Sequence, residues 1–143
     1  MAMLRTMAGG AALIAAVFIC RIVQAETASQ CYSCYEKTDE PADLDAAVMI
    51  SGCTALIHSG DRNGHELAMA FTVRGLGYRR TFLFELAFED FDEAISLDPA
   101  YAPAYRHRGT MYLERGEIER ARQDFDQAAR LELAEARLGD EEL

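Results

Sequence analysis

The sequence predicts an all-α fold of antiparallel helical hairpins, and two observations support this prediction. The first is an internal repeat: residues 68–101 and 102–135 carry the same residue types in the same order, 34 positions apart and without a gap. The second is the placement of small residues, since each copy has a Gly and an Ala where two helices would touch and aromatic residues beside them. One hairpin cannot cover its own apolar face, so a second copy is needed to bury it. The recurrent residues are Phe71, Arg74, Gly75, Tyr78, Ala87, Phe91, Ala94 and Leu97 in the first copy, and Tyr105, Arg108, Gly109, Tyr112, Ala121, Phe125, Ala128 and Leu131 in the second.

Residues 1–25 have the pattern of a secretory signal peptide. Arg5 stands near the start, an uncharged apolar run covers residues 8–20, and small residues precede a cleavage site after Ala25. The run is shorter than the about 20 apolar residues of a spanning helix. We therefore expect cleavage after Ala25 and a periplasmic or secreted protein with no membrane segment. Retention as an anchor is the alternative; acylation of Cys20 is disfavoured because Ile19 precedes it.

The charge of the chain excludes one class of partner. Its 143 residues carry a formal net charge of -10, and removal of the leader takes away two cations, Arg5 and Arg21, and no anion. A small acidic protein lacks the basic face that nucleic-acid binding requires. We expect one domain and no nucleic-acid partner.

The remaining elements follow in order. Residues 26–43 predict an irregular segment that contains Cys31 and Cys34, because they are polar and lack apolar periodicity. Residues 44–58 predict an N-terminal helix with an apolar face, which we expect to pack against the first helix of the first copy. In the first copy we expect one helix from Glu66 or Leu67 to Arg80 and a second over residues 85–97, which Pro99 ends. In the second copy we expect helices over residues 102–115 and 118–133. Because Leu133 replaces the expected Pro, we expect the last helix to run on toward Leu138, and residues 136–143 to form an acidic tail.

The turn within the first copy departs from the pattern. Phe82, Leu83 and Phe84 stand where the second copy has Gly116, Glu117 and Ile118. The loss of Gly predicts a strained turn or a longer helix. The extra apolar side chains predict either a contact with the N-terminal segment or an exposed patch.

The 34-residue period, with an aromatic residue, Gly, Tyr, Ala, aromatic residue and Ala in that order, resembles the tetratricopeptide repeat (TPR) family. This resemblance implies an α-solenoid of helix hairpins with an N-terminal helix, which acts as a protein-protein interaction scaffold and not as an enzyme. The stretch 50–57, with Cys53 followed by Thr54, also resembles the N-terminal helix of small exported bacterial TPR proteins.

The family resemblance also implies where a partner would bind. In TPR proteins the first helix of each hairpin lines a concave groove, and basic residues gather on both of these helices here. The residues expected to meet a protein or peptide partner are Thr72, Arg79, Arg80, Arg106, Thr110 and Leu113. Their arginines favour an acidic partner. The Lys and Asn pair with which chaperone-binding members clamp a terminal carboxylate is missing, and Arg74 and Arg108, each next to a packing Gly, are expected to be structural.

Three cysteines remain after cleavage: Cys31, Cys34 and Cys53. A disulfide in an exported protein would join the irregular segment to the N-terminal helix, and the family resemblance favours Cys34 with Cys53 over Cys31 with Cys53. The alternative function is a thiol-disulfide oxidoreductase or redox sensor that uses Cys31 and Cys34, although no strand precedes this pair.

No residues form a catalytic, metal or cofactor motif, so we expect no enzyme activity, no metal and no cofactor. His58, His65 and His107 are expected at the surface or at helix ends. Acidic residues are expected to pair with arginines on helix surfaces, such as Glu117 with Arg120 and Asp126 with Arg130.

Overall fold

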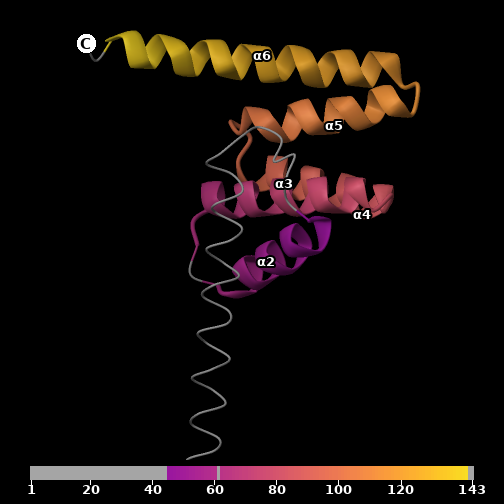
Figure 1. Ribbon diagram of the computed structural model, residues 1–143. Helices are drawn as coiled ribbons and strands as arrows, with labels where there is room; N and C mark the ends of the chain where they lie inside the picture. Colours follow the sequence, from indigo (N-terminus) through magenta and orange to yellow (C-terminus); the bar gives the residue numbers. More distant parts are fainter. Residues whose placement is uncertain (1–44, 61, 142–143) are drawn as a thin grey trace, which may run out of the picture.

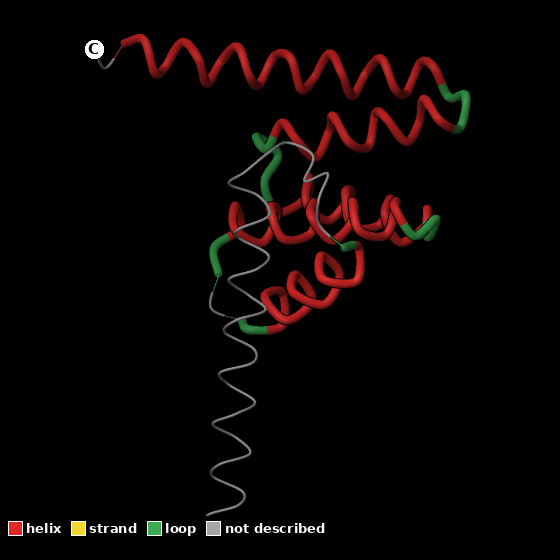
Figure 2. Tube along the Cα trace, viewed as in Figure 1, coloured by secondary structure: helices red, strands yellow, loops and turns green. Residues whose placement is uncertain are grey.

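The computed structural model describes residues 45–60 and 62–141, and this part of the chain consists of helices and short connections (Figure 1). The helices are α2 (Ala46–His58), α3 (Gly64–Arg80), α4 (Phe84–Leu97), α5 (Ala102–Glu114) and α6 (Ile118–Glu141). The hairpins α3/α4 and α5/α6 stack on each other, and α2 packs against α3 on the other side, as the tube in Figure 2 shows. The predicted all-α fold is confirmed. The predicted leader, Cys31 and Cys34 lie outside the described residues.

The helix α2 begins two residues later than predicted, at Ala46. The reason is local, because the carboxylate of Asp45 accepts a hydrogen bond from the backbone N–H of Ala47 at 2.8 Å and so caps the helix. Met49, Cys53 and Leu56 on α2 are buried in one core cluster with residues of α3 and α4. The expected packing of this helix on the first hairpin is therefore present.

Glycines let the helices of each hairpin approach, as the sequence predicted. A Cβ atom added to Gly75 would lie 2.8 Å from Cε1 of Phe91, and one added to Gly109 would lie 3.1 Å from Cε1 of Phe125. A third glycine, Gly77, has the same role between α2 and α3, because its Cβ would lie 2.9 Å from Cγ1 of Ile50. Gly77 could not be predicted as a packing position from the repeat, because the equivalent position in the second copy is Met111.

The first hairpin starts earlier and α6 ends later than predicted. Asn63 caps α3 by accepting from the backbone N–H of Glu66 at 2.9 Å, which moves the start of this helix to Gly64. The helix α6 continues to Glu141, through the position where Leu133 replaces Pro and into the predicted acidic tail. Its C-terminal part projects beyond α5, and residues 132–138 are exposed (Figure 1).

The projecting end of α6 should contribute little to stability. We expect a chain that stops after Leu133 to lose less than about 1 kcal/mol of unfolding free energy, because the removed side chains have little burial to lose. The variant keeps the ion pair between Arg106 and Glu132. Chemical denaturation of the two chains measures the difference, and a loss of several kcal/mol would mean that the projecting end packs against the rest of the chain.

Candidate partner-binding face

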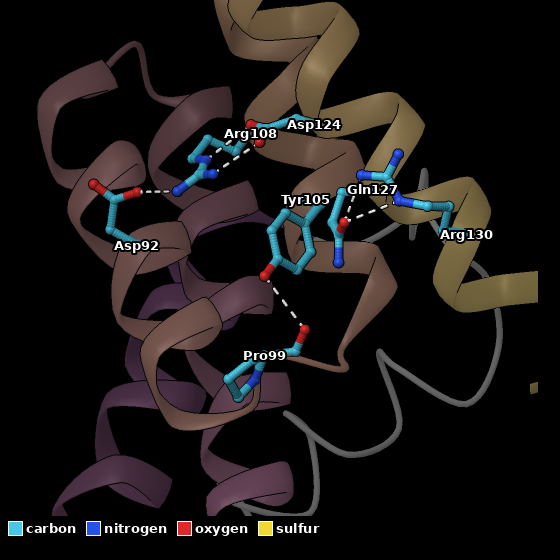
Figure 3. Close-up of polar contacts among 7 residues, drawn as sticks. All are labelled: Asp92, Pro99, Tyr105, Arg108, Asp124, Gln127 and Arg130. Carbon is cyan, nitrogen blue, oxygen red and sulfur yellow. Dashed lines mark hydrogen bonds and ion pairs between the residues drawn. The ribbon is translucent and has the colours of Figure 1, made fainter. Parts of the chain in front are cut away.

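The arginine next to each packing glycine joins three helices. Arg74 of α3 donates from Nε and Nη2 to the carboxylate of Asp90 in α4, at 2.9 and 2.7 Å, and from Nη1 to Oγ1 of Thr54 in α2, at 3.4 Å. Arg108 of α5 repeats this arrangement with Asp124 of α6, at 2.8 Å for both bonds, and with Asp92 of α4, at 2.6 Å (Figure 3). The expectation that both arginines are structural is confirmed.

The acidic partners of these arginines were missed in the sequence, although a signal was present. Asp90 and Asp124 lie 34 positions apart, each 16 residues after its arginine. Burial raises the pKa of Asp90 above its ordinary value, although the hydrogen bonds and charge of Arg74 lower it. The hydrogen bonds that Arg74 and Arg108 donate to these carboxylates raise the pKa of both arginines, so both guanidinium groups stay charged.

The arginine face, which we define as Arg79, Arg80, Arg106, Thr110 and Leu113, is formed by α3 and α5. Arg106, Thr110 and Leu113 follow at steps of four and three, and therefore share one side of α5. Arg79 reaches the same helix from α3, because its Nη2 lies 2.6 Å from the carboxylate of Glu114. Leu113 is 50% exposed. The structure thus places five of the six predicted residues at or near the surface of two neighbouring helices.

The arginines of this face already have neighbours within the chain. Nη2 of Arg106 lies 2.8 Å from the carboxylate of Glu132 on α6, as Arg79 lies close to Glu114. Nη1 of Arg80 lies 3.5 Å from Sδ of Met49 on α2. These contacts hold the guanidinium groups in place, and a carboxylate from a partner would compete with Glu114 and Glu132.

The sixth predicted residue, Thr72, lies elsewhere than expected. It is 2% exposed, and its hydroxyl donates to the backbone carbonyl of Ala68 at 2.8 Å. Thr110 of α5 makes the same kind of bond, to the backbone carbonyl of Arg106 at 3.0 Å, but is only half-buried. Thr72 therefore belongs to the core of the described part and does not offer its side chain to a partner.

One expectation for the histidines was wrong. His107 is buried near the middle of α5 and its ring stacks on that of Phe91 at 6.0 Å between centroids, because it faces the first hairpin. His58 and His65 are exposed near helix ends, as expected, and His65 pairs with Asp98.

The surface ion pairs agree with the expectation in one case and differ in another. Glu117 and Arg120 pair at 2.7 Å. Arg130 instead donates to the side-chain oxygen of Gln127, at 2.7 Å from Nη2 (Figure 3). Asp126 lies 3.9 Å from Nη1 of Arg122. Such exposed contacts contribute little to stability.

No cluster suited to a metal ion occurs in the part of the chain that the structure describes. Among the helices described, none combines the length and the apolar character needed to span a bilayer. Cys53 is fully buried in the core between α2 and α3. Its predicted partner Cys34 lies outside the described residues, so the predicted bridge remains a prediction.

Comparison with known proteins identifies the fold. No protein-family model matches the sequence, and no curated protein does. Among solved structures, the chain is similar to MamA, with a TM-score of 0.56 and 24% identity over 64% of this chain and 52% of that one. It is also similar to the second TPR of Spaghetti (RPAP3) bound to the HSP90 peptide SRMEEVD, with a TM-score of 0.56 and 24% identity over 76% of this chain and 91% of that one. The chain thus spans about half of the MamA chain.

Proposed function

Because the described helices form a TPR-like fold, we propose that this protein is a protein-protein interaction scaffold that binds a partner segment on its arginine face. The observation that carries the proposal is the set of three arginines presented by α3 and α5, the first helices of the two hairpins. A structural neighbour with the same fold is bound to a peptide, which supports a protein or peptide as the partner.

We further propose that the partner segment is acidic. Guanidinium groups pair with carboxylates through two parallel N–H donors, which gives both attraction and orientation. Arg79 and Arg106 already pair with carboxylates of the chain, and an acidic partner would replace Glu114 and Glu132 in these pairs. Exposed ion pairs contribute little energy, so this exchange costs little and the affinity should depend on salt.

A titration with an acidic peptide tests this proposal. The probe is the heptapeptide SRMEEVD, with free and with amidated C-terminus, and binding is measured by calorimetry at low and at physiological salt. The double substitution Arg80→Glu with Arg106→Glu should weaken binding at least tenfold, because it replaces attraction with repulsion. Since the sequence lacks the clamp for a terminal carboxylate, both forms of the peptide should bind alike.

Two matched variants sharpen the titration. Arg120→Glu with Arg122→Glu makes the same change of charge on the exposed side of α6 and should leave the affinity nearly unchanged. Glu114→Gln with Glu132→Gln removes the competing carboxylates and should strengthen binding several-fold. The acidic-partner proposal is wrong if the affinity for the peptide does not change with Arg80→Glu/Arg106→Glu, with Glu114→Gln/Glu132→Gln or with salt.

The location and the cysteine chemistry are part of the same proposal. The leader over residues 1–25 supports export to the periplasm or the cell exterior, and sequencing the N-terminus of the mature protein tests it, with Glu26 expected first. Peptide mapping under non-reducing conditions should find Cys34 joined to Cys53. A readily reduced bridge between Cys31 and Cys34 would instead support the redox alternative.

A further inference from the structure

The turn between α3 and α4 holds an aromatic residue in an unfavourable backbone conformation. Phe82 has a φ of 61°, and it is the one non-glycine residue with positive φ between 45 and 60 or between 62 and 141. Its counterpart in the second repeat is Gly116, whose φ is 77°. Glycine adopts this conformation without steric cost, whereas a bulky side chain does not. The fold therefore does not need Phe82, and the residue points to a role outside folding.

The side chains at this turn form an apolar corner, which we define as Phe82, Leu83 and Phe84. Phe82 is 78% exposed and Leu83 is 48% exposed, although both are strongly apolar. The ring of Phe82 meets the edge of the Phe84 ring, with centroids 6.0 Å apart. The sequence left open whether these side chains contact the N-terminal segment or form an exposed patch, and for Phe82 and Leu83 the structure shows an exposed patch.

A small pocket continues the corner toward α5. It has a volume of about 90 Å³ and is lined by Phe84, Met111, Glu114 and Arg115. Phe84 belongs to both features, so the corner and the pocket are contiguous. An engineered cavity that takes benzene measures roughly 150 Å³. The pocket here is smaller, and its size suits a branched aliphatic side chain better than an aromatic ring.

The charges around the pocket are balanced within the chain. Glu114 pairs with Arg79, and Arg115 pairs with Glu85 while its guanidinium lies 4.3 Å from the centroid of the Phe88 ring. The pocket rim therefore has no excess of one sign to attract a charged occupant. The net charge of -10 also disfavours an anionic membrane surface as the occupant.

We propose that the apolar corner and its pocket form a second docking surface, which takes an uncharged partner segment and anchors one of its aliphatic side chains in the pocket beside Phe84, over the buried Met111. A second copy of this chain is a poorer occupant. The three corner residues expose on the order of 400 Å² at most, since one aromatic side chain offers roughly 150–250 Å², and a stable dimer buries about 800 Å² on each partner. The surface has different chemistry from the arginine face, so its role does not depend on the acidic partner.

The test uses the full-length chain and three nine-residue peptides that share an uncharged Gly/Ser frame, capped at both ends, with Leu, Phe or Asp at the centre. Binding is followed by NMR through the methyl group of Met111. The informative variant is Phe82→Gly with Leu83→Glu, which gives the first repeat the turn residues that the second repeat has at 116 and 117. This variant should fold at least as stably, because it removes the strained φ.

The Leu peptide should shift the Met111 signal in a saturable way that is indifferent to salt, and the Phe82→Gly/Leu83→Glu variant should bind it at least tenfold more weakly. The Phe and Asp peptides should bind at least tenfold more weakly than the Leu peptide. Arg80→Glu with Arg106→Glu should leave the Leu peptide unaffected, which separates this surface from the arginine face. The proposal is overturned if no peptide shifts Met111, or if all three bind alike. It is also overturned if the Phe82→Gly/Leu83→Glu variant binds the Leu peptide normally and loses instead self-association or binding to phosphatidylcholine vesicles.

Discussion

Replacing Arg74 with Ala should lower the free energy of unfolding by about 3 kcal/mol, because it leaves the Asp90 carboxylate buried without its cation. The side chain of Asp90 is only 6% exposed, and Arg74 supplies both of the charged hydrogen bonds that it accepts. Chemical denaturation monitored by circular dichroism measures the loss. The double change Arg74→Met with Asp90→Leu should recover most of it, since an apolar pair of similar size leaves no buried charge.

The Arg74→Ala variant should also acquire a distinctive dependence on pH. Burial raises the pKa of Asp90 and Arg74 lowers it, so removal of Arg74 should raise this pKa further. A carboxyl group with a higher pKa in the folded than in the unfolded state stabilises the fold while protonated, and this stability is lost as the pH rises through the folded pKa. The deficit should therefore be smaller near pH 4 than near pH 7. An equal deficit at both values would show that the carboxylate of Asp90 is not the cause.

Replacing Gly75 with Leu should be the most damaging change to the packing within a hairpin, with a cost of about 3 kcal/mol or more. An added Cβ would lie 2.8 Å from Phe91, whose side chain is fully buried, so its ring can move aside only by displacing its core neighbours. A loss of this size should lower the Tm by more than about 10 °C in a domain of this length. Differential scanning calorimetry measures the change.

Gly109→Leu provides the matched comparison in the second repeat. Its Cβ would lie 3.1 Å from Phe125, which is only half-buried at the open end of the stack and can move aside. We expect a cost of roughly 1 to 2 kcal/mol, smaller than at Gly75. If the Tm were unchanged in both variants, the assignment of these glycines as packing positions would be wrong.

The repeat made most of the fold predictable. A fixed period of 34 residues places every small and aromatic position twice, so the assignment of helices and the contacts within each hairpin could be checked against a second copy in the same chain. The structure confirms the packing of Gly75 on Phe91 and of Gly109 on Phe125 on this basis. Helix boundaries were less accurate, because single capping side chains such as Asp45 and Asn63 set them.

Differences between the two copies could not be read from their shared pattern. His107 stands where the first copy has Val73, and only the stack of hairpins shows that it faces Phe91. Thr72 stands where the second copy has Arg106, and Thr72 is buried whereas Arg106 is half-buried and pairs with Glu132. The sequence marked the turn at Phe82 as irregular but did not show the positive φ or the pocket beside it.

Site-specific photo-crosslinking in the native cells tests the central claim, that a partner segment binds on the arginine face, most directly. A photoreactive residue is placed in turn at Thr110 and Leu113 on the arginine face, and at Arg122 on the exposed side of α6 as a control. We expect the photoreactive residues at Thr110 and at Leu113 to crosslink to the same acidic segment of one partner protein, and these adducts to disappear in the Arg80→Glu/Arg106→Glu variant. Adducts formed at Arg122 but not at Thr110 or Leu113 would contradict it.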